Sequence, residues 1–215
     1  MPIDYLFLIA ILIFSVILHE ISHGYAAELQ GDPTARLSGR LTLNPLPHLD
    51  LWGSFIIPLL LIMTNAGFVI GWAKPVPYNP HNLRNKKWGE ALVAGAGPAL
   101  NIFIALLFSV LLRVNGTMSF LPASAIEIVV FVVYINLLLA FFNLLPIPPL
   151  DGSKLLASIL PYRFARFVSA SELMYRYGPI AGFFLIFLFI FFLWPIFFRF
   201  VTLLFTLLTG MPPIL

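Results

Sequence analysis

The 215-residue sequence contains no cysteine, and only 10% of its residues are charged. Without cysteine, the chain has no disulfides, no thiolate zinc ligands and no cysteine nucleophile. Soluble domains are about 45–50% apolar and about 25% charged, whereas this chain is 60% apolar, has 22 Phe and reaches a mean hydropathy of +0.99. We therefore predict an integral membrane protein. In this setting the pI of about 9.3 indicates contact with anionic lipid headgroups and argues against nucleic acid as a partner.

Four apolar runs are long enough to cross a bilayer, which takes about 20 helical residues. They cover residues 4–28, 91–113, 126–146 and 178–208. The first follows Asp4 where a signal peptide would carry Lys or Arg, so we treat it as a retained span. The last contains Trp194-Pro195, so we expect a span that ends near Trp194 and then a kinked or interfacial helix with Arg199. The sequence predicts an all-α polytopic membrane protein with about four transmembrane helices.

No stretch between these runs reaches the 50 or so residues that a separate soluble domain usually needs. We therefore predict one membrane-embedded domain over residues 1–215. Residues 153–177 mix basic side chains with Leu, Tyr and Phe, which is typical of an interfacial segment, here interrupted at Pro161.

Residues 19–23 read His-Glu-Ile-Ser-His and lie inside the first apolar run. Residues four apart share one face of a helix, so His19 and His23 can both bind one Zn²⁺. Glu20 can reach a water molecule at that metal and act as general base. Ionisable side chains at bilayer depth each cost a few kcal/mol. The pattern at this depth therefore indicates a zinc-dependent hydrolase that works within the membrane.

Hydrolytic zinc sites usually have three protein ligands and one open position. Asp151 follows a proline-rich stretch that cannot continue a helix and that can aim the carboxylate inward. The same Asp-Gly-Ser-Lys sequence is also suited to an Asp that caps the next helix. The residues alone leave both interpretations open. The candidates for the third ligand are Glu28, Asp32, His48, Asp50, His81 and Asp151.

Three ordered motifs resemble those of the site-2 protease family of intramembrane zinc metalloproteases. They are His19-Glu20-Ile-Ser-His23, Gly97-Pro98-Ala-Leu-Asn101, and Asn143-Leu-Leu-Pro-Ile-Pro-Pro-Leu-Asp151-Gly152. The resemblance implies His19, His23 and Asp151 as ligands of one Zn²⁺ per chain, Glu20 as catalytic acid and base, and Asn143 as a catalytic polar group near the scissile peptide. For Asn101, a hydrogen bond between helices remains an equal alternative.

The resemblance covers most of residues 4–156, which we expect to form the catalytic core. Residues 157–215 would then supply the C-terminal interfacial segment and span. No PDZ insertion and no nucleotide-sensing segment is recognisable, so we expect a minimal form of the family.

Residues 52–72 are apolar but contain Pro58, Gly67 and Gly71, and their end favours strand and turn. Residues 71–80 also resemble the membrane-embedded β-hairpin region of the family. If Asp151 meets His19, the spans 4–28 and 126–146 run in the same direction, so 52–72 must enter and leave on one side. That arrangement puts 10 of the 12 basic residues on one side, against 8 for a full crossing. The positive-inside rule favours it. We predict a re-entrant, partly β-hairpin segment near the cytoplasmic side.

The implied function is hydrolysis of peptide bonds in or near transmembrane segments of single-pass membrane proteins, as in regulated intramembrane proteolysis. The expected location is the cytoplasmic membrane, with the active site toward the cytoplasm and the lipid bilayer as a partner. The substrate identity, the trigger and the oligomeric state do not follow from the sequence. Two alternatives remain: a metal transporter or sensor, since intramembrane His and Asp also mark ion pathways, and an inactive relative that binds transmembrane segments.

Overall fold

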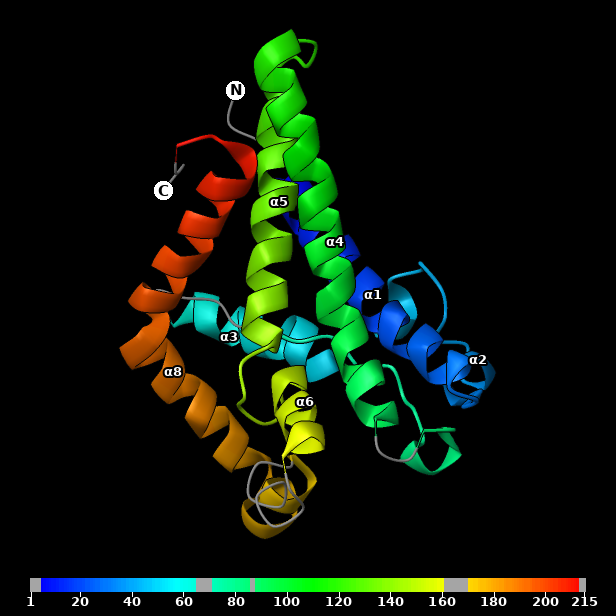
Figure 1. The fold of residues 1–215 in the computed structure, drawn as a ribbon. Helices are drawn as coiled ribbons and strands as arrows, with labels where there is room; N and C mark the ends of the chain where they lie inside the picture. The colour runs from blue at the N-terminus through cyan, green and yellow to red at the C-terminus, as the bar shows by residue number, and fades with distance from the viewer. Residues whose placement is uncertain (1–4, 65–70, 86–87, 161–169, 213–215) are drawn as a thin grey trace.

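A computed structural model describes residues 5–64, 71–85, 88–160 and 170–212 (Figure 1), and these residues form helices and connections without any strand. The long helices are α1 (Tyr5–Leu29), α4 (Gly89–Met118), α5 (Ala123–Asn143) and α8 (Ala170–Thr209). The short elements are α2 (Thr34–Leu37), the 3-10 turn η1 (Leu46–His48), the π-helical η2 (Leu51–Ile56), α3 (Ile57–Met63), the 3-10 turn η3 (Pro80–Asn82) and α6 (Asp151–Ile159).

Four helices are long and apolar enough to cross a membrane, which confirms the all-α polytopic prediction. They comprise Phe7–Leu29 within α1, all of α4 and α5, and Phe184–Thr209 within α8. No more than 39% of the apolar window of any of them is buried inside the protein. The remaining Leu, Ile and Phe side chains point outward, where a bilayer, unlike water, solvates them at no cost.

Helices α4 and α5 lie side by side as an antiparallel pair (Figure 1). Ser119 ends α4 in the left-handed conformation (φ 49°), and the side chain of Asn115 accepts a hydrogen bond of 2.7 Å from the Leu121 backbone N–H. Pro122 then precedes α5. The buried face of this pair packs against α8 through a core that includes Leu112, Val133, Leu137, Val201 and Phe205.

Helix α8 continues through Pro195, so the expected end of the span near Trp194 is wrong. Figure 1 shows that α8 bends along its length, in keeping with the kink that proline introduces. Proline is tolerated within apolar helices because local adjustments and neighbouring groups re-satisfy the freed carbonyl. The interruption expected at Pro161 lies outside the described residues.

The re-entrant segment expected at residues 52–72 and the β-hairpin expected at residues 71–80 contain no strand in their described parts. Residues 51–63 form η2 and α3, and residues 71–79 have no assigned secondary structure, while residues 65–70 lie outside the described residues. Asp50 starts η2 by accepting a hydrogen bond of 2.7 Å from the Gly53 backbone N–H. The N-terminal cap and the apolar run favour helix over residues 51–63, which precede residues 67–80, where strand and hairpin were expected.

The connection from α1 to α4 leaves and returns at the same end of the bundle. The backbone N–H of Arg84 donates to the Gln30 carbonyl at 2.7 Å. The carboxylate of Asp32, which is fully buried, accepts from Thr34, from the Asn79 backbone N–H at 2.6 Å and from Asn82 Nδ2 at 2.8 Å. These bonds fix residues 79–84 beside the end of α1.

Candidate metal centre

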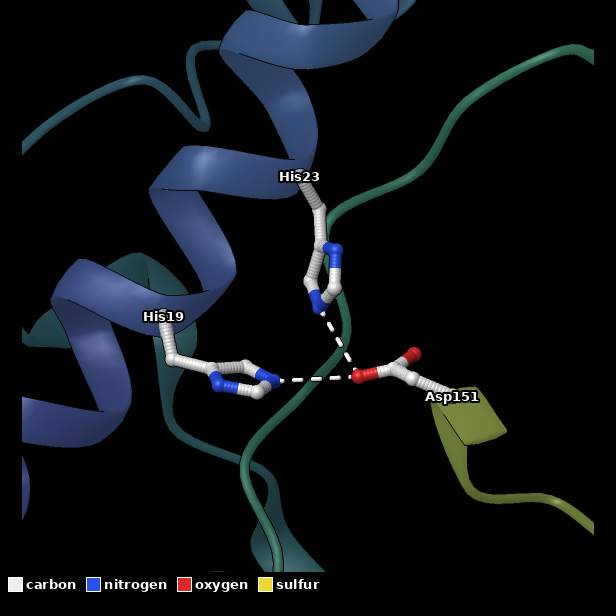
Figure 2. Close-up of side chains that lie close together, drawn as sticks. All are labelled: His19, His23 and Asp151. Carbon is white, nitrogen blue, oxygen red and sulfur yellow. Dashed lines mark hydrogen bonds and ion pairs between the residues drawn. The ribbon is translucent and has the colours of Figure 1, made fainter. Parts of the chain in front are cut away.

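His19, His23 and Asp151 meet at one buried point, although 132 positions separate His19 from Asp151 in the chain. The Nε2 atoms of both imidazoles lie 3.1 Å from Asp151 Oδ2. Figure 2 shows the two histidines projecting from one face of α1 toward the carboxylate at the start of α6. Each side chain is exposed by no more than about a tenth. The three potential ligand atoms all lie within 4.8 Å of one another.

The second nitrogen of each imidazole already has an acceptor. His19 Nδ1 donates to Asn101 Oδ1 at 2.5 Å, and His23 Nδ1 donates to the Val93 carbonyl at 2.7 Å. With hydrogen on Nδ1, each neutral ring directs a lone pair from Nε2 toward the Asp151 oxygen. Lone pairs facing a carboxylate repel unless a cation lies among them.

These distances fit a zinc ion. Ligands at about 2.0–2.1 Å from a tetrahedral zinc are separated by about 3.3 Å, close to the observed 3.1 Å. Ligating histidines almost always donate their other ring N–H to an oxygen acceptor, as both do here. The donor set, the spacing and the outer hydrogen bonds therefore all suit one metal ion.

Two glycines make room for this cluster. A Cβ at Gly97 would lie 2.5 Å from the Nε2 atoms of both His19 and His23, well inside ordinary contact. A Cβ at Gly152 would overlap the Leu144 carbonyl oxygen. The first glycine lets α4 approach the imidazoles, and the second lets the start of α6 press against the end of α5.

Asp151 does not cap α6. Leu150 occupies the cap position without a side-chain hydrogen bond, and Asp151 is the first helical residue. Lys154 Nζ lies 3.8 Å from Asp151 Oδ1, and its positive charge favours the ionised carboxylate.

A cavity of about 140 Å³ lies beside the cluster, and Glu20 and Asn143 line it together with the three clustered side chains. The Glu20 carboxylate accepts a hydrogen bond of 2.8 Å from the Val76 backbone N–H. Asn143, at the end of α5, donates from Nδ2 to the Leu139 carbonyl at 2.9 Å. The other lining residues are His19, His23, Pro75, Val76, Tyr78, Val93, Ala94, Pro149, Leu150, Asp151 and Lys154.

Residues 71–79, which we call the covering segment, form one wall of this cavity. The buried guanidinium of Arg40 donates from Nη2 to the carbonyls of Lys74 and the following proline, at 2.7 and 2.9 Å. The bond from Val76 to Glu20 ties the same segment to α1. At its far end, burial followed by the charges of Glu90 and Asp151 raises the pKa of Tyr78 to about 12, so its phenol stays neutral.

The other sequence candidates for the third ligand lie elsewhere, and among the described residues only His19, His23 and Asp151 form a group that could hold a metal. Glu28 pairs with Arg36, and Asp32 anchors residues 79–82. His48 is buried and donates from Nε2 to the Thr42 carbonyl, Asp50 caps η2, and the His81 backbone N–H donates to Asn79.

Sequence reasoning missed the contributions of Gly97, Arg40 and Lys154. The run Ala94-Gly95-Ala96-Gly97 carried a usable signal, because small residues in an apolar helix mark close helix contacts. For Arg40, no local pattern distinguishes a buried guanidinium from a solvated one.

A bundle of long apolar helices around a buried cluster of two histidines and one carboxylate defines a membrane-embedded metalloprotein. The family model described as "Peptidase family M50" matches residues 7–121 and 117–189. The chain is 39% identical over 161 residues to "Putative zinc metalloprotease YwhC" of Bacillus subtilis, covering 72% of this chain and 69% of that protein. No solved structure matches.

Two mycobacterial relatives carry the name "Putative zinc metalloprotease Rip2". The Mycolicibacterium smegmatis protein is 32% identical over 69% of this chain and 55% of its own length. The Mycobacterium tuberculosis protein is 31% identical over 84% of this chain and 64% of its own length. The chain thus spans about half to two-thirds of these relatives. It belongs to peptidase family M50, the site-2 protease family, whose cofactor is zinc.

Proposed function

We propose that this chain is an intramembrane zinc endopeptidase that hydrolyses peptide bonds in or near transmembrane segments of single-pass membrane proteins. The observation that carries the proposal is the buried meeting of His19, His23 and Asp151 beside Glu20. Burying three ionisable side chains together in a membrane protein is energetically costly, and such groups usually mark a binding or catalytic site. The membership of peptidase family M50 favours hydrolysis over transport.

His19 Nε2, His23 Nε2 and Asp151 Oδ2 would hold the zinc ion. When bound, zinc supplies a Lewis acid that makes water nucleophilic near neutral pH. Glu20 takes the proton from the attacking water and delivers it to the leaving amine. The Val76 N–H engages Oε2 of Glu20, so we assign the proton transfer to Oε1. Asn143 lines the same cavity and would stabilise the oxyanion that develops on the substrate carbonyl.

A peptide bond within a helix is shielded by its own hydrogen bonds, so the substrate must unwind locally at the cavity. Segments that contain Gly, Pro or Asn unwind most readily. We therefore expect cleavage at such positions. This feature fits regulated intramembrane proteolysis, in which the substrate is a single span.

The proposed location is the cytoplasmic membrane, with the cavity toward the cytoplasm. Among the described residues, the segments that border the site end of the spans contain Arg36, Arg40, Lys74, Arg84 and Lys154, which agrees with the positive-inside rule. η2 and α3 have 6 and 7 residues and together fall short of the 20 or so needed to cross, so we keep their re-entrant placement in the proposal. We propose residues 1–215 as one membrane-embedded domain, with a catalytic core of about 4–156.

The test uses purified protein reconstituted into liposomes with zinc and a single-pass substrate whose span contains Gly and Pro. Wild type should cleave within the span. Glu20→Gln should abolish cleavage while the protein still binds one zinc per chain. Glu127→Gln provides the matched control, because Glu127 is exposed near the opposite end of α5.

Undiminished cleavage by Glu20→Gln would refute the assigned base. Zinc flux across the liposomes without cleavage would replace the proposal with transport. Zinc binding and substrate capture without cleavage, under conditions where an active family member cuts the same substrate, would mark the chain as an inactive binder of transmembrane segments.

A further inference from the structure

A chain of buried polar side chains runs from His19 away from the cavity and across three helices. His19 Nδ1 contacts Asn101 Oδ1 at 2.5 Å, Asn101 Nδ2 contacts Asn136 Oδ1 at 2.7 Å, and Asn136 Nδ2 contacts Ser15 Oγ at 3.0 Å. Asn136 Nδ2 also donates to the Val132 carbonyl at 2.8 Å. Both asparagines are fully buried, and His19 and Ser15 are exposed by only 5%. We call this chain the asparagine relay.

The direction of every hydrogen bond in the relay follows from its far end. The Val132 carbonyl has no proton, so the amide nitrogen of Asn136 must face it. The oxygen of Asn136 then faces Asn101, so Asn101 must present its nitrogen there and its oxygen toward His19. An amide oxygen only accepts, so His19 Nδ1 must carry the hydrogen. The relay thus leaves His19 Nε2 with a lone pair aimed at Asp151.

We infer that Asn136, acting through Asn101, is a positioning residue that fixes the tautomer and the ring orientation of His19. This inference rests on the proposed function, because it assigns His19 as a zinc ligand. A neutral imidazole in water distributes its proton between two tautomers, and only the form with hydrogen on Nδ1 can bind zinc through Nε2. Fixing that form before the metal arrives removes the cost of reorganising it. A backbone carbonyl of α5 therefore controls the chemistry of a side chain on α1.

A purely structural role for the asparagines is the competing explanation, because amides between helices also stabilise bundles. The two explanations differ in what they expect of His19. A structural role changes the thermal stability and leaves the tautomer alone. The positioning role changes the tautomer and the zinc affinity together.

The first measurement is the zinc affinity of the purified full-length protein, by competition with a chromophoric chelator. Removal of an outer-shell partner typically costs 10- to 100-fold in metal affinity, and we expect that loss for Asn101→Ala. We expect a loss of roughly three- to tenfold for Asn136→Leu. This variant keeps Asn101 but removes the Asn136 oxygen that orients the Asn101 amide. The double variant should match Asn101→Ala alone, because both changes break one chain.

Ser109→Ala is the matched control. Ser109 lies on α4, is exposed by 2%, and its Oγ has no hydrogen-bond partner in the described part of the chain. Its removal changes a buried polar group in the same bundle without touching the relay, so the zinc affinity should not change. If Asn136→Leu does not yield folded protein, Asn136→Ala replaces it. Alanine also removes the amide oxygen that accepts from Asn101 Nδ2, so the same loss is expected.

The second measurement is the nitrogen NMR spectrum of His19 in metal-free protein, assigned by its loss in His19→Gln. Wild type and Ser109→Ala should keep the hydrogen on Nδ1, and Asn136→Leu should show a share of rings without it. An unchanged tautomer and zinc affinity in Asn136→Leu would overturn the inference while leaving the proposed function intact. Failure of wild type to bind zinc would overturn both.

Discussion

Gly97→Ala tests the close approach of α4 to the two imidazoles. The added Cβ would lie 2.5 Å from both Nε2 atoms, whereas ordinary contact begins near 3.4 Å, so the rings or the helix must retreat by about 0.9 Å. Zinc sites hold their ligand distances to within about 0.2 Å. We therefore expect at least a hundredfold weaker zinc binding, which corresponds to about 2.8 kcal/mol.

Gly95→Ala is the control for this prediction, since it makes the same substitution two residues earlier on the same helix. The nearest atom to its added Cβ would be a methyl of Leu155 at 3.9 Å, an ordinary contact. Both changes also raise helix propensity by about 1 kcal/mol, so the comparison isolates the steric effect. Zinc content and zinc affinity are measured for both purified variants. Equal zinc affinity in Gly97→Ala and Gly95→Ala would refute the reasoning.

Three further predictions concern stability and the covering segment. Burial works to raise the pKa of Asp32, but the hydrogen bonds that its carboxylate accepts hold this pKa below the usual 3.8. Asp32→Asn should therefore lower the free energy of unfolding by about 1–3 kcal/mol at pH 7. The difference from wild type in thermal unfolding should shrink as the pH falls below about 4. A constant difference down to pH 2 would contradict this. Arg40→Leu removes two hydrogen bonds to the covering segment, so it should speed hydrogen–deuterium exchange of the backbone amides in residues 74–78. The control is Arg84→Leu, and equal exchange rates in the two variants would argue against the role of Arg40 in holding the covering segment. The guanidinium of Arg113 donates to the carbonyls of Leu207 and Leu208 at the end of α8. Arg113→Met should therefore lower the free energy of unfolding by about 1 kcal/mol and leave the zinc affinity unchanged. A fall in zinc affinity would refute a purely structural role.

The spans were predictable because their signal is local. About 20 apolar residues in a row have one stable solution in a bilayer, and α1, α4 and α5 follow it. The pairing of His19 with His23 was also local, because a helix fixes it through its period. By contrast, the placement of Asp151 depends on how α5 packs on α4 and α1, and the residues alone left it open between a ligand and a helix cap.

The wrong predictions concern segments whose structure depends on surroundings that the local sequence does not show. At Pro195 the rule for aqueous helices predicts an end, but an apolar environment tolerates the proline. Strand and turn were expected at residues 67–72 and a hairpin at 71–80; residues 71–79 have no assigned secondary structure, and residues 67–70 lie outside the described residues. The role of Asn136 was not predicted, because the sequence does not show which side chains a single amide in an apolar span will contact. Its partners on α1 and α4 appear only once the helices are packed.

The separation of the cluster along the chain has a consequence for biosynthesis. Translation supplies the two imidazoles with the first span, but the carboxylate follows α5, 132 positions after His19. A nascent polypeptide therefore lacks the complete cluster while its earlier spans are entering the bilayer. The proposed hydrolytic site would be complete only after α1, α4 and α5 have associated.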